Sequence, residues 1–353
     1  MKLSYWKRYD LVFKLFSPKK IYNKILGFAK NLGKPFTKKS NRGPKLKLQP
    51  EEYAAYTTFK ASKGETYRDM ESDTDLFFNK HLDHSIFEKN LKKIPCEYLR
   101  KLLQLSGQFL ENLLGHTKVH IPDSTKLSTD RYKDIIYQGK PRRVKETFKL
   151  HTMVQRHPKK QMTIIMDGFS SDDHISDSEG AVRMVHVLQE GDILPADRGY
   201  DYEKVYEACA NKKVRTNIKK QDRKDGKGFR FRKKAKFRKQ SYKKQRGVVE
   251  TRYATIENAG LTLTHYRNED ARFKYGIMLE IKQNIDNLLR LEVEKLFFIW
   301  IYSTNSIVSQ TLKTNSNFIK HAKKIRKLER KNTEEKRSKI SEGHTKSIRE
   351  QSP

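Results

Sequence analysis

Two aspartates in this sequence follow apolar runs that are typical of buried strands. Asp123 stands in VHIPDST and Asp197 in ILPADRG. An aspartate after a strand is often only a turn residue, but two carboxylates that meet at one sheet edge can hold a hard cation such as Mg²⁺. Glu250, in RGVVETRYATIEN, is the candidate for a third oxygen ligand, because the apolar residues around it recur at helical spacing and could dock on the sheet. Together the three residues suit metal-assisted chemistry at a phosphate.

A strongly basic stretch precedes Glu250. Between Lys212 and Arg246, 18 of 35 residues are Lys or Arg and two are Asp. Phenylalanines alternate with arginines there, so rings could stack on bases while guanidinium groups hold phosphates. The alternative is a charged loop whose aromatic rings tuck into the core, and for Arg198 an ion pair with Asp201. We expect DNA contact through Arg198, Arg230, Arg232, Lys233, Lys234, Lys236, Arg238, Lys243, Lys244, Arg246 and Arg252.

The composition of the whole chain agrees with a nucleic-acid partner. Its 353 residues include 76 Lys and Arg against 42 Asp and Glu, a net charge of +34, which attracts polyanions. The strongest apolar run, 296–302, is shorter than the roughly 20 residues that span a bilayer, and charges interrupt the first sixteen residues where a secretory signal would be apolar. Two cysteines support neither a disulfide framework nor a cysteine-rich zinc site. We therefore expect a soluble intracellular protein without a membrane partner.

The elements that must position the acidic residues begin after Gly115. The pattern predicts three strands, then a helix, a short buried strand, an amphipathic helix and a further strand, over 117–125, 148–156, 160–168, 178–189, 191–197, 201–212 and 214–219. This order predicts an α/β fold, a mixed sheet flanked by helices that is similar to the ribonuclease-H-like core. In such a sheet the first and fourth strands can lie side by side, which would bring Asp123 and Asp197 together.

Composition divides the chain into four regions. We expect a basic, flexible arm over 1–50, a helical region over 51–115, the catalytic α/β domain over 116–305 and a charged, disordered tail over 306–353. Within the helical region, the apolar pattern after Asp83 predicts two helices that break at Pro95. The pair is either a helix-turn-helix that reads DNA or a simple packing pair.

Four stretches of the chain resemble a prokaryotic insertion-sequence DDE transposase, whose DDE domain has a ribonuclease-H-like fold. They are HIPDSTKLS, LPADRGYDYEKVYEA, KKQRGVVETRYATIENAGL and IKQNIDNLLRL. In that family the first aspartate follows strand one, the second lies in an ADRGYD or ADKGYD box, and the glutamate lies in an R-x-x-V/I-E helix. The resemblance covers roughly residues 83–291. It departs at Glu257, where the family commonly has a lysine.

The resemblance implies that Asp123, Asp197 and Glu250 are the catalytic triad and the ligands of two Mg²⁺ or Mn²⁺ ions. It also implies double-stranded DNA partners, namely transposon ends and target, which the protein would cleave and join in DNA transposition. A homodimer in the DNA complex and a cytoplasmic, nucleoid-associated location in a prokaryote are further expectations. Two alternatives are an inactive DNA-binding derivative and a ribonuclease-H-like nuclease without strand transfer.

Other titratable residues are given structural interpretations. His116 and His120 are four residues apart, but they flank a predicted strand and are interpreted as surface or core histidines. An acidic cluster in DGFSSDDHISDSEG is interpreted as turn and helix-capping chemistry, and its members are Asp167, Asp172, Asp173, His174 and Asp177.

Overall fold

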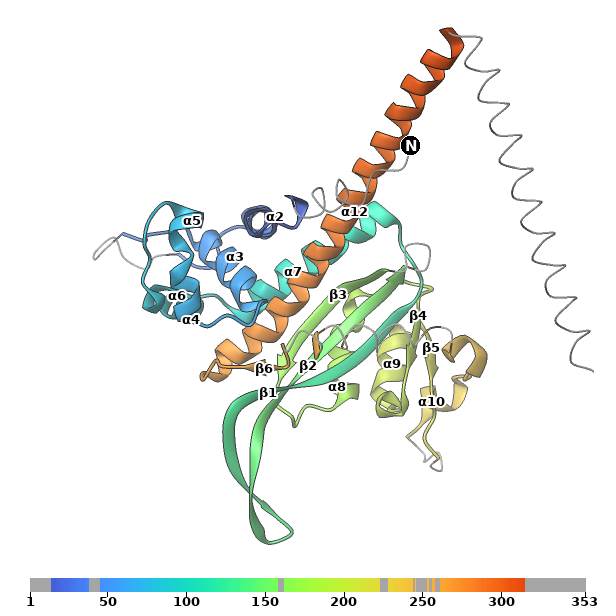
Figure 1. Ribbon diagram of the computed structural model, residues 1–353. Helices are drawn as coiled ribbons and strands as arrows, with labels where there is room; N and C mark the ends of the chain where they lie inside the picture. Colours follow the sequence, from blue (N-terminus) through green and yellow to red (C-terminus); the bar gives the residue numbers. More distant parts are fainter. Residues whose placement is uncertain are drawn as a thin grey trace, which may run out of the picture. The chain divides into compact units, whose positions relative to one another are not determined.

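The computed structural model describes residues 14–37, 45–157, 162–222, 228–243, 245, 253, 256–257 and 261–314, with side chains up to residue 295. The chain divides into two compact units, Tyr9–Leu291 and Met1–Arg8 with Glu292–Pro353. The first unit holds the sheet and its helices (Figure 1). Of the second unit the structure describes the C-terminal stretch of helix α12 (Glu269–Thr314).

The strands form a mixed sheet of four strands in the order β3-β2-β1-β6 and a two-stranded sheet of β4 and β5. Strand β2 lies antiparallel between β1 and β3, while β4 runs parallel to β5. A parallel bridge from Val119 to Ile193 joins β4 to the start of β1. Farther along the same side of the sheet, β6 pairs with β1. The strands are β1 (His120–Tyr137), β2 (Lys140–His157), β3 (Met162–Ser171), β4 (Ile193–Ala196), β5 (Arg215–Ile218) and β6 (Leu263–Thr264).

Helices cover both faces of this sheet, and each face has its own apolar core. Helix α7 (Cys96–Leu114) packs on β3, and Asn284 of α12 binds the Ile165 backbone of β3 through both its amide nitrogen and its oxygen, at 2.8 and 3.0 Å. Helices α8 (Asp177–Met184) and α9 (Glu203–Asn211) share a second core with β4 and β5. The predicted ribonuclease-H-like fold, a mixed sheet flanked by helices, is confirmed (Figure 1).

The helical region before the sheet contains more helix than the charge pattern predicts. Helices α6 and α7 confirm the predicted pair, which breaks at Pro95. In the predicted arm, however, residues 18–32 form a helix whose apolar stripe is buried against α3 and α7. The stripe has helical spacing, but the surrounding lysines hide it in the composition. The remaining elements are α2 (Pro18–Leu32), α3 (Pro50–Ala61), α4 (Tyr67–Ser72), α5 (Thr74–Phe78) and α6 (His84–Leu91).

Strands β1 and β2 extend well past the predicted strands, through a tight turn at Gln138 and Gly139. Both turn residues have positive φ, 50° and 74°, which suits the two-residue turn of a hairpin. The pattern does not predict this extension because charged residues occupy both of its faces, so the usual alternation of apolar and polar residues is absent. Among the described residues, none of the helices combines the length and hydropathy that a membrane span requires.

Candidate active site

Asp123 and Asp197 lie at corresponding points of two neighbouring parallel strands. The bridge between Val119 and Ile193 fixes the register of β1 and β4, and four residues on from it the two chains reach Asp123 and Asp197. Asp197 follows β4, as predicted, whereas Asp123 lies inside β1, because that strand continues to Tyr137. Each carboxylate is oriented by a nearby backbone N–H: Asp123 Oδ1 accepts from the Ser124 N–H and Asp197 Oδ1 from the Gly199 N–H, both at 2.9 Å.

A third carboxylate, Asp177, stands beside Asp197. A Cβ atom at Gly199 would lie 3.1 Å from Asp197 Oδ1 and 3.4 Å from Asp177 Oδ2, so the two carboxylates flank the same glycine. Asp177 Oδ1 accepts a hydrogen bond from Ser124 Oγ at 2.7 Å and pairs with Lys149 Nζ at 3.1 Å. Sequence reasoning placed Asp177 among helix-capping residues. It does begin α8, but the helix cap itself is Ser176, and Asp177 reaches across to β1 and β2.

Tyr200 shows that these acidic groups surround one point. Burial raises the pKa of its hydroxyl well above the ordinary value. Nearby acidic groups raise that pKa further, and they are Asp123, Asp177, Tyr253 and Asp197. Tyr253 comes three residues after Glu250 and is buried. Glu250 itself lies outside the described residues, so the position of the third predicted catalytic residue is not described.

The basic stretch before Glu250 folds against the end of the sheet. We define the basic segment as its described part, residues 228–243. Asn217 of β5 accepts from the Arg238 N–H at 2.8 Å, which docks the segment on the sheet. Seven of the residues predicted to bind DNA are exposed: Arg198, Arg230, Lys233, Lys234, Lys236, Arg238 and Lys243. Three others, Lys244, Arg246 and Arg252, lie outside the described residues.

Arg232 differs from its basic neighbours because it is buried. Its guanidinium donates to both carboxylate oxygens of Asp201, at 2.8 and 2.7 Å. Burial raises the pKa of Asp201, but hydrogen bonds from Arg232, the Gln221 N–H and Tyr206 outweigh it and lower the pKa below its ordinary value. The ion pair considered for Arg198 is thus made by Arg232, and Arg198 is exposed beside Asp197.

The aromatic rings of the basic segment do not all face outward. Phe231 packs against the core of α9, β4 and β5, while Phe237 meets Tyr242 edge to face with ring centroids 5.3 Å apart. The segment encloses a groove of about 500 Å³ against β5 and α9. Basic side chains line this groove, and they are Arg215, Lys234, Lys236 and Arg238.

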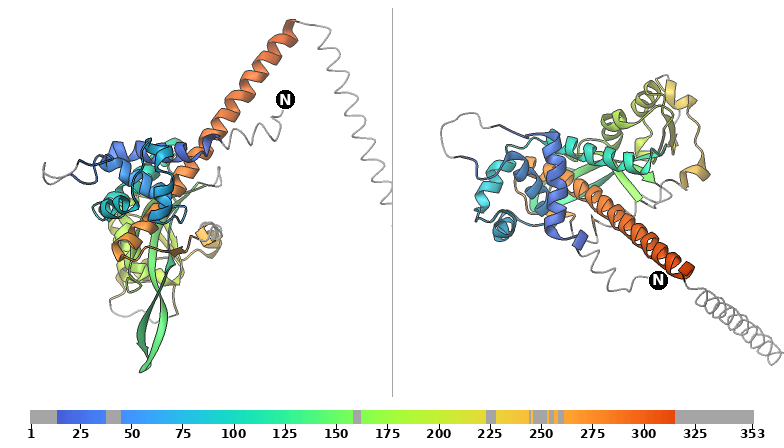
Figure 2. Two further views of the ribbon diagram at one scale, coloured as in Figure 1. Left: turned by 60° about the vertical axis from the view of Figure 1, so that its left-hand side comes forward. Right: turned by 90° about the horizontal axis from the view of Figure 1, so that it is seen from above.

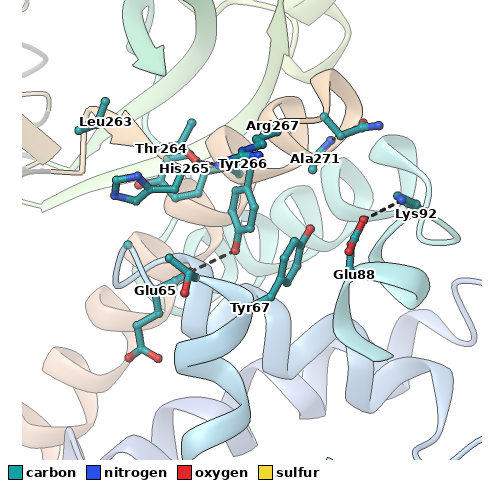
Figure 3. Close-up of a pocket in the computed structure, with 14 residues that line it drawn as sticks. Glu65, Tyr67, Glu88, Lys92, Leu263, Thr264, His265, Tyr266, Arg267 and Ala271 are labelled. Carbon is teal, nitrogen blue, oxygen red and sulfur yellow. Dashed lines mark hydrogen bonds and ion pairs between the residues drawn. The ribbon is translucent and has the colours of Figure 1, made fainter. Parts of the chain in front are cut away.

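Two other features, a cluster of possible metal ligands and a cavity, contain none of the predicted catalytic residues. Among the described residues, one group of ligand atoms gathers within 4.8 Å, and it comprises Glu71, Asp83 and His84. In this group Asp83 caps α6, and Glu71 bonds to His84 Nδ1 at 2.9 Å, so its contacts join α4 to α6. A cavity of about 500 Å³ lies between Tyr67 and the β6–α12 turn (Figure 3).

His116 and His120 form a polar network at the far end of β1. His116 bridges Glu111 and Asp192, at 2.6 and 2.8 Å, and His120 Nδ1 lies 3.2 Å from Asp192. Burial lowers the pKa of His116, but its two acidic partners outweigh burial and raise it; burial lowers the pKa of His120 to about 4. These contacts join α7 to the β1–β4 junction.

The oxygen donors of Asp123, Asp177 and Asp197 are of the chemical type that a hard divalent cation takes, although their ligand atoms do not all lie within 4.8 Å of one another. Carboxylates such as Asp123, Asp177 and Asp197 are the ligands that Mg²⁺ and Mn²⁺ prefer, and Lys149 offsets part of their mutual repulsion. The ribonuclease-H-like fold and its two neighbouring aspartates place this protein in the class of ribonuclease-H-like proteins that carry acidic residues at one edge of the sheet.

Within that class, residues 115–281 match the family model of the transposase DDE domain. This match supports the DDE transposase that the motifs indicated. No curated protein matches the chain. DDE transposases act on DNA and generally use divalent metal ions.

Proposed function

We propose that this protein is the transposase of an insertion sequence, which cleaves DNA at the element's ends and joins those ends to a target. The observation that carries the proposal is the matched position of Asp123 and Asp197 on β1 and β4, inside the region that matches the transposase DDE domain. Both steps are phosphoryl transfers, in which a water or a 3′-hydroxyl attacks a phosphodiester and the 3′-oxygen leaves.

In this proposal Asp123, Asp197 and Glu250 hold two Mg²⁺ or Mn²⁺ ions. When bound, such ions activate the attacking oxygen and neutralise charge on the leaving oxygen. The chain's own residues fix where this happens. The backbone N–H groups of Ser124 and Gly199 orient the two aspartates. Tyr253, three residues after Glu250 in the sequence, is among the groups that raise the pKa of Tyr200, which supports including Glu250 in the proposal.

We include Asp177 in the proposed site as a positioning residue. It contacts Ser124, the neighbour of Asp123, and it flanks Gly199 together with Asp197. A carboxylate in this position adds negative potential at the cation site and holds the two aspartate-bearing turns together. Lys149 limits the resulting repulsion when no cation is bound.

The DNA surface in this proposal consists of the exposed cations around the basic segment. Arg198 lies next to Asp197, and the groove beside β5 continues the positive surface away from the aspartates. Phosphate contacts of this kind bind duplex DNA without reading its sequence. Arg232 does not belong to this surface, because its guanidinium is buried and forms an ion pair with Asp201. A homodimer on paired element ends, in the cytoplasm where the nucleoid lies, completes the proposal.

The proposal is tested with the full chain and a supercoiled plasmid that carries the gene with its native flanking DNA. We expect Mg²⁺- or Mn²⁺-dependent cleavage at the flanks and joining of pre-cut ends to a second plasmid. Cleavage without joining would identify a nuclease that lacks strand transfer. DNA binding without either reaction, at any Mg²⁺ or Mn²⁺ concentration, would identify an inactive DNA-binding derivative.

A further inference from the structure

The hairpin made by β1 and β2 continues as a ribbon of two strands that no other strand of the described residues pairs with. We define the hairpin arm as residues 130–145. Strand β3 pairs with β2 only from Lys149 onward, and β6 pairs with β1 only at Ser128 and Thr129. Beyond these points, within the part of the chain that the structure describes, the two strands pair with each other alone (Figures 1 and 2).

Nearly every side chain of the arm is exposed, including large apolar ones. Ile136 is 80% exposed, Tyr132 58% and Tyr137 55%. All other arm residues except Ile135 and Val144 are exposed as well. An isolated two-stranded hairpin is marginally stable in water, so exposed rings and an exposed isoleucine at its end add little to folding. The exposure of these apolar side chains is better explained if the arm binds another molecule through them.

The arm carries positive charge on both of its faces. It contains six basic residues and two acidic ones, and one of the acidic pair, Asp130, lies 3.6 Å from His265. The register places Tyr132 and Arg143 on one face and Tyr137 and Arg142 on the other. On each face the arginine lies over the tyrosine ring, at 5.4 and 5.9 Å from its centroid.

This combination favours a polyanion over a second copy of the chain. A second copy also carries a charge of +34 and would repel a basic arm at long range. Duplex DNA offers phosphates for the guanidinium groups and sugar and base surfaces for the rings. Its major groove is wide enough to admit a two-stranded β-ribbon.

We propose that the hairpin arm is a second DNA-binding element that enters a groove of the duplex. The proposal rests on the proposed function, in which DNA is the substrate. Asp123 and Tyr137 belong to the same strand, and at about 3.3 Å per residue Tyr137 lies at most about 46 Å from Asp123. At about 3.4 Å per base pair, that is up to roughly 14 base pairs from the reacting phosphate.

The first test compares charge removal in the arm with the same removal elsewhere. In the full chain, Arg142→Ala with Arg143→Ala should reduce the slope of log K against log salt by about 2 for a mixed-sequence duplex, since each lost phosphate contact contributes about 0.9. The matched control is Lys118→Ala with Lys213→Ala, two exposed lysines that precede β1 and β5 at the opposite end of those strands. Arg142→Lys with Arg143→Lys should keep the slope.

The second test locates the arm directly. Duplexes with bromodeoxyuridine at single positions are irradiated with the wild-type protein, and crosslinked peptides are identified by mass spectrometry. We expect crosslinks to Tyr132 or Tyr137 within about 14 base pairs of the cleavage position. An unchanged salt slope together with no crosslink in residues 130–145 would overturn the arm proposal while leaving the transposase proposal intact.

Two further outcomes complete the test. A wild-type protein that does not bind the duplex at all would overturn both proposals. If Tyr132→Ser with Ile136→Ser changed the sedimentation coefficient of the DNA-free protein and left the salt slope unaltered, the arm would bind another copy and the DNA assignment would fail. Thermal unfolding of each variant should match the wild type, because the altered side chains are exposed.

Discussion

The two aspartates of the candidate site and the basic segment are built in opposite ways. Asp123 and Asp197 are half-buried, and each is oriented by a nearby backbone N–H. The cations of the basic segment are exposed, except Arg232, which is buried and forms an ion pair with Asp201. Chemistry at a phosphate needs groups fixed to within a fraction of an ångström, whereas attraction of a polyanion needs only charge at its surface. The difference predicts distinct consequences of substitution in the two regions.

The largest expected effect is on catalysis. Asp197→Asn keeps the size of the side chain and its acceptor for the Gly199 N–H but removes the charge that holds a cation. Cleavage should fall by about a thousandfold or more, as for other essential catalytic groups, while DNA affinity without metal stays unchanged. Gel assays of plasmid cleavage measure the first and fluorescence anisotropy the second. Glu190→Gln is the control, because it removes one exposed charge of a surface pair. A variant that cleaves at nearly the wild-type rate would show that Asp197 is a turn residue.

The second effect is on folding, and it comes from inside the basic segment. Arg232→Ala leaves the buried Asp201 carboxylate without its guanidinium and should lower the free energy of unfolding by about 3–5 kcal/mol. Lys234→Ala, two residues away and exposed, should change it by less than about 0.5 kcal/mol. Urea denaturation of the two variants measures this contrast. Equal stability would mean that Arg232 contributes like a surface cation.

A smaller effect tests the positioning role of Asp177. Asp177→Asn retains an acceptor for Ser124 Oγ but removes charge beside Asp197, so cleavage at low Mg²⁺ should fall by about 10–100-fold. The Mg²⁺ concentration that gives half-maximal rate should rise, and Mn²⁺ should restore part of the activity. A merely structural role would lower the melting temperature and leave the metal dependence unchanged.

The smallest effect per residue is expected in the exposed cations. Replacing Lys233, Lys234, Lys236 and Arg238 together by alanine should reduce the slope of log K against log salt by about 3 to 4, with no single residue decisive. Fluorescence anisotropy at several salt concentrations measures the slope, and thermal unfolding should be unchanged. A slope equal to that of the wild type would show that the basic segment faces away from DNA.

Much of the site was predictable because its signals are local. The apolar runs before Asp123 and Asp197 predicted buried strands, and the element order predicted that the first and fourth strands are neighbours. The bridge between Val119 and Ile193 confirms that neighbourhood. The long hairpin was not predictable in the same way, because its strands bury neither face and therefore lack the alternation on which a strand prediction rests.

The sequence by itself predicted the buried apolar runs next to Asp123 and Asp197, because periodicity and turn residues act over a few positions. Only the tertiary structure decided which charged side chains contact other residues of the protein and which are exposed at a surface where a ligand can bind. Asp177 reaches Ser124 from another helix, and Arg232 meets Asp201 across a loop. Such contacts join residues more than thirty positions apart along the chain, and they depend on how loops and helices pack, which no local pattern of residue types records.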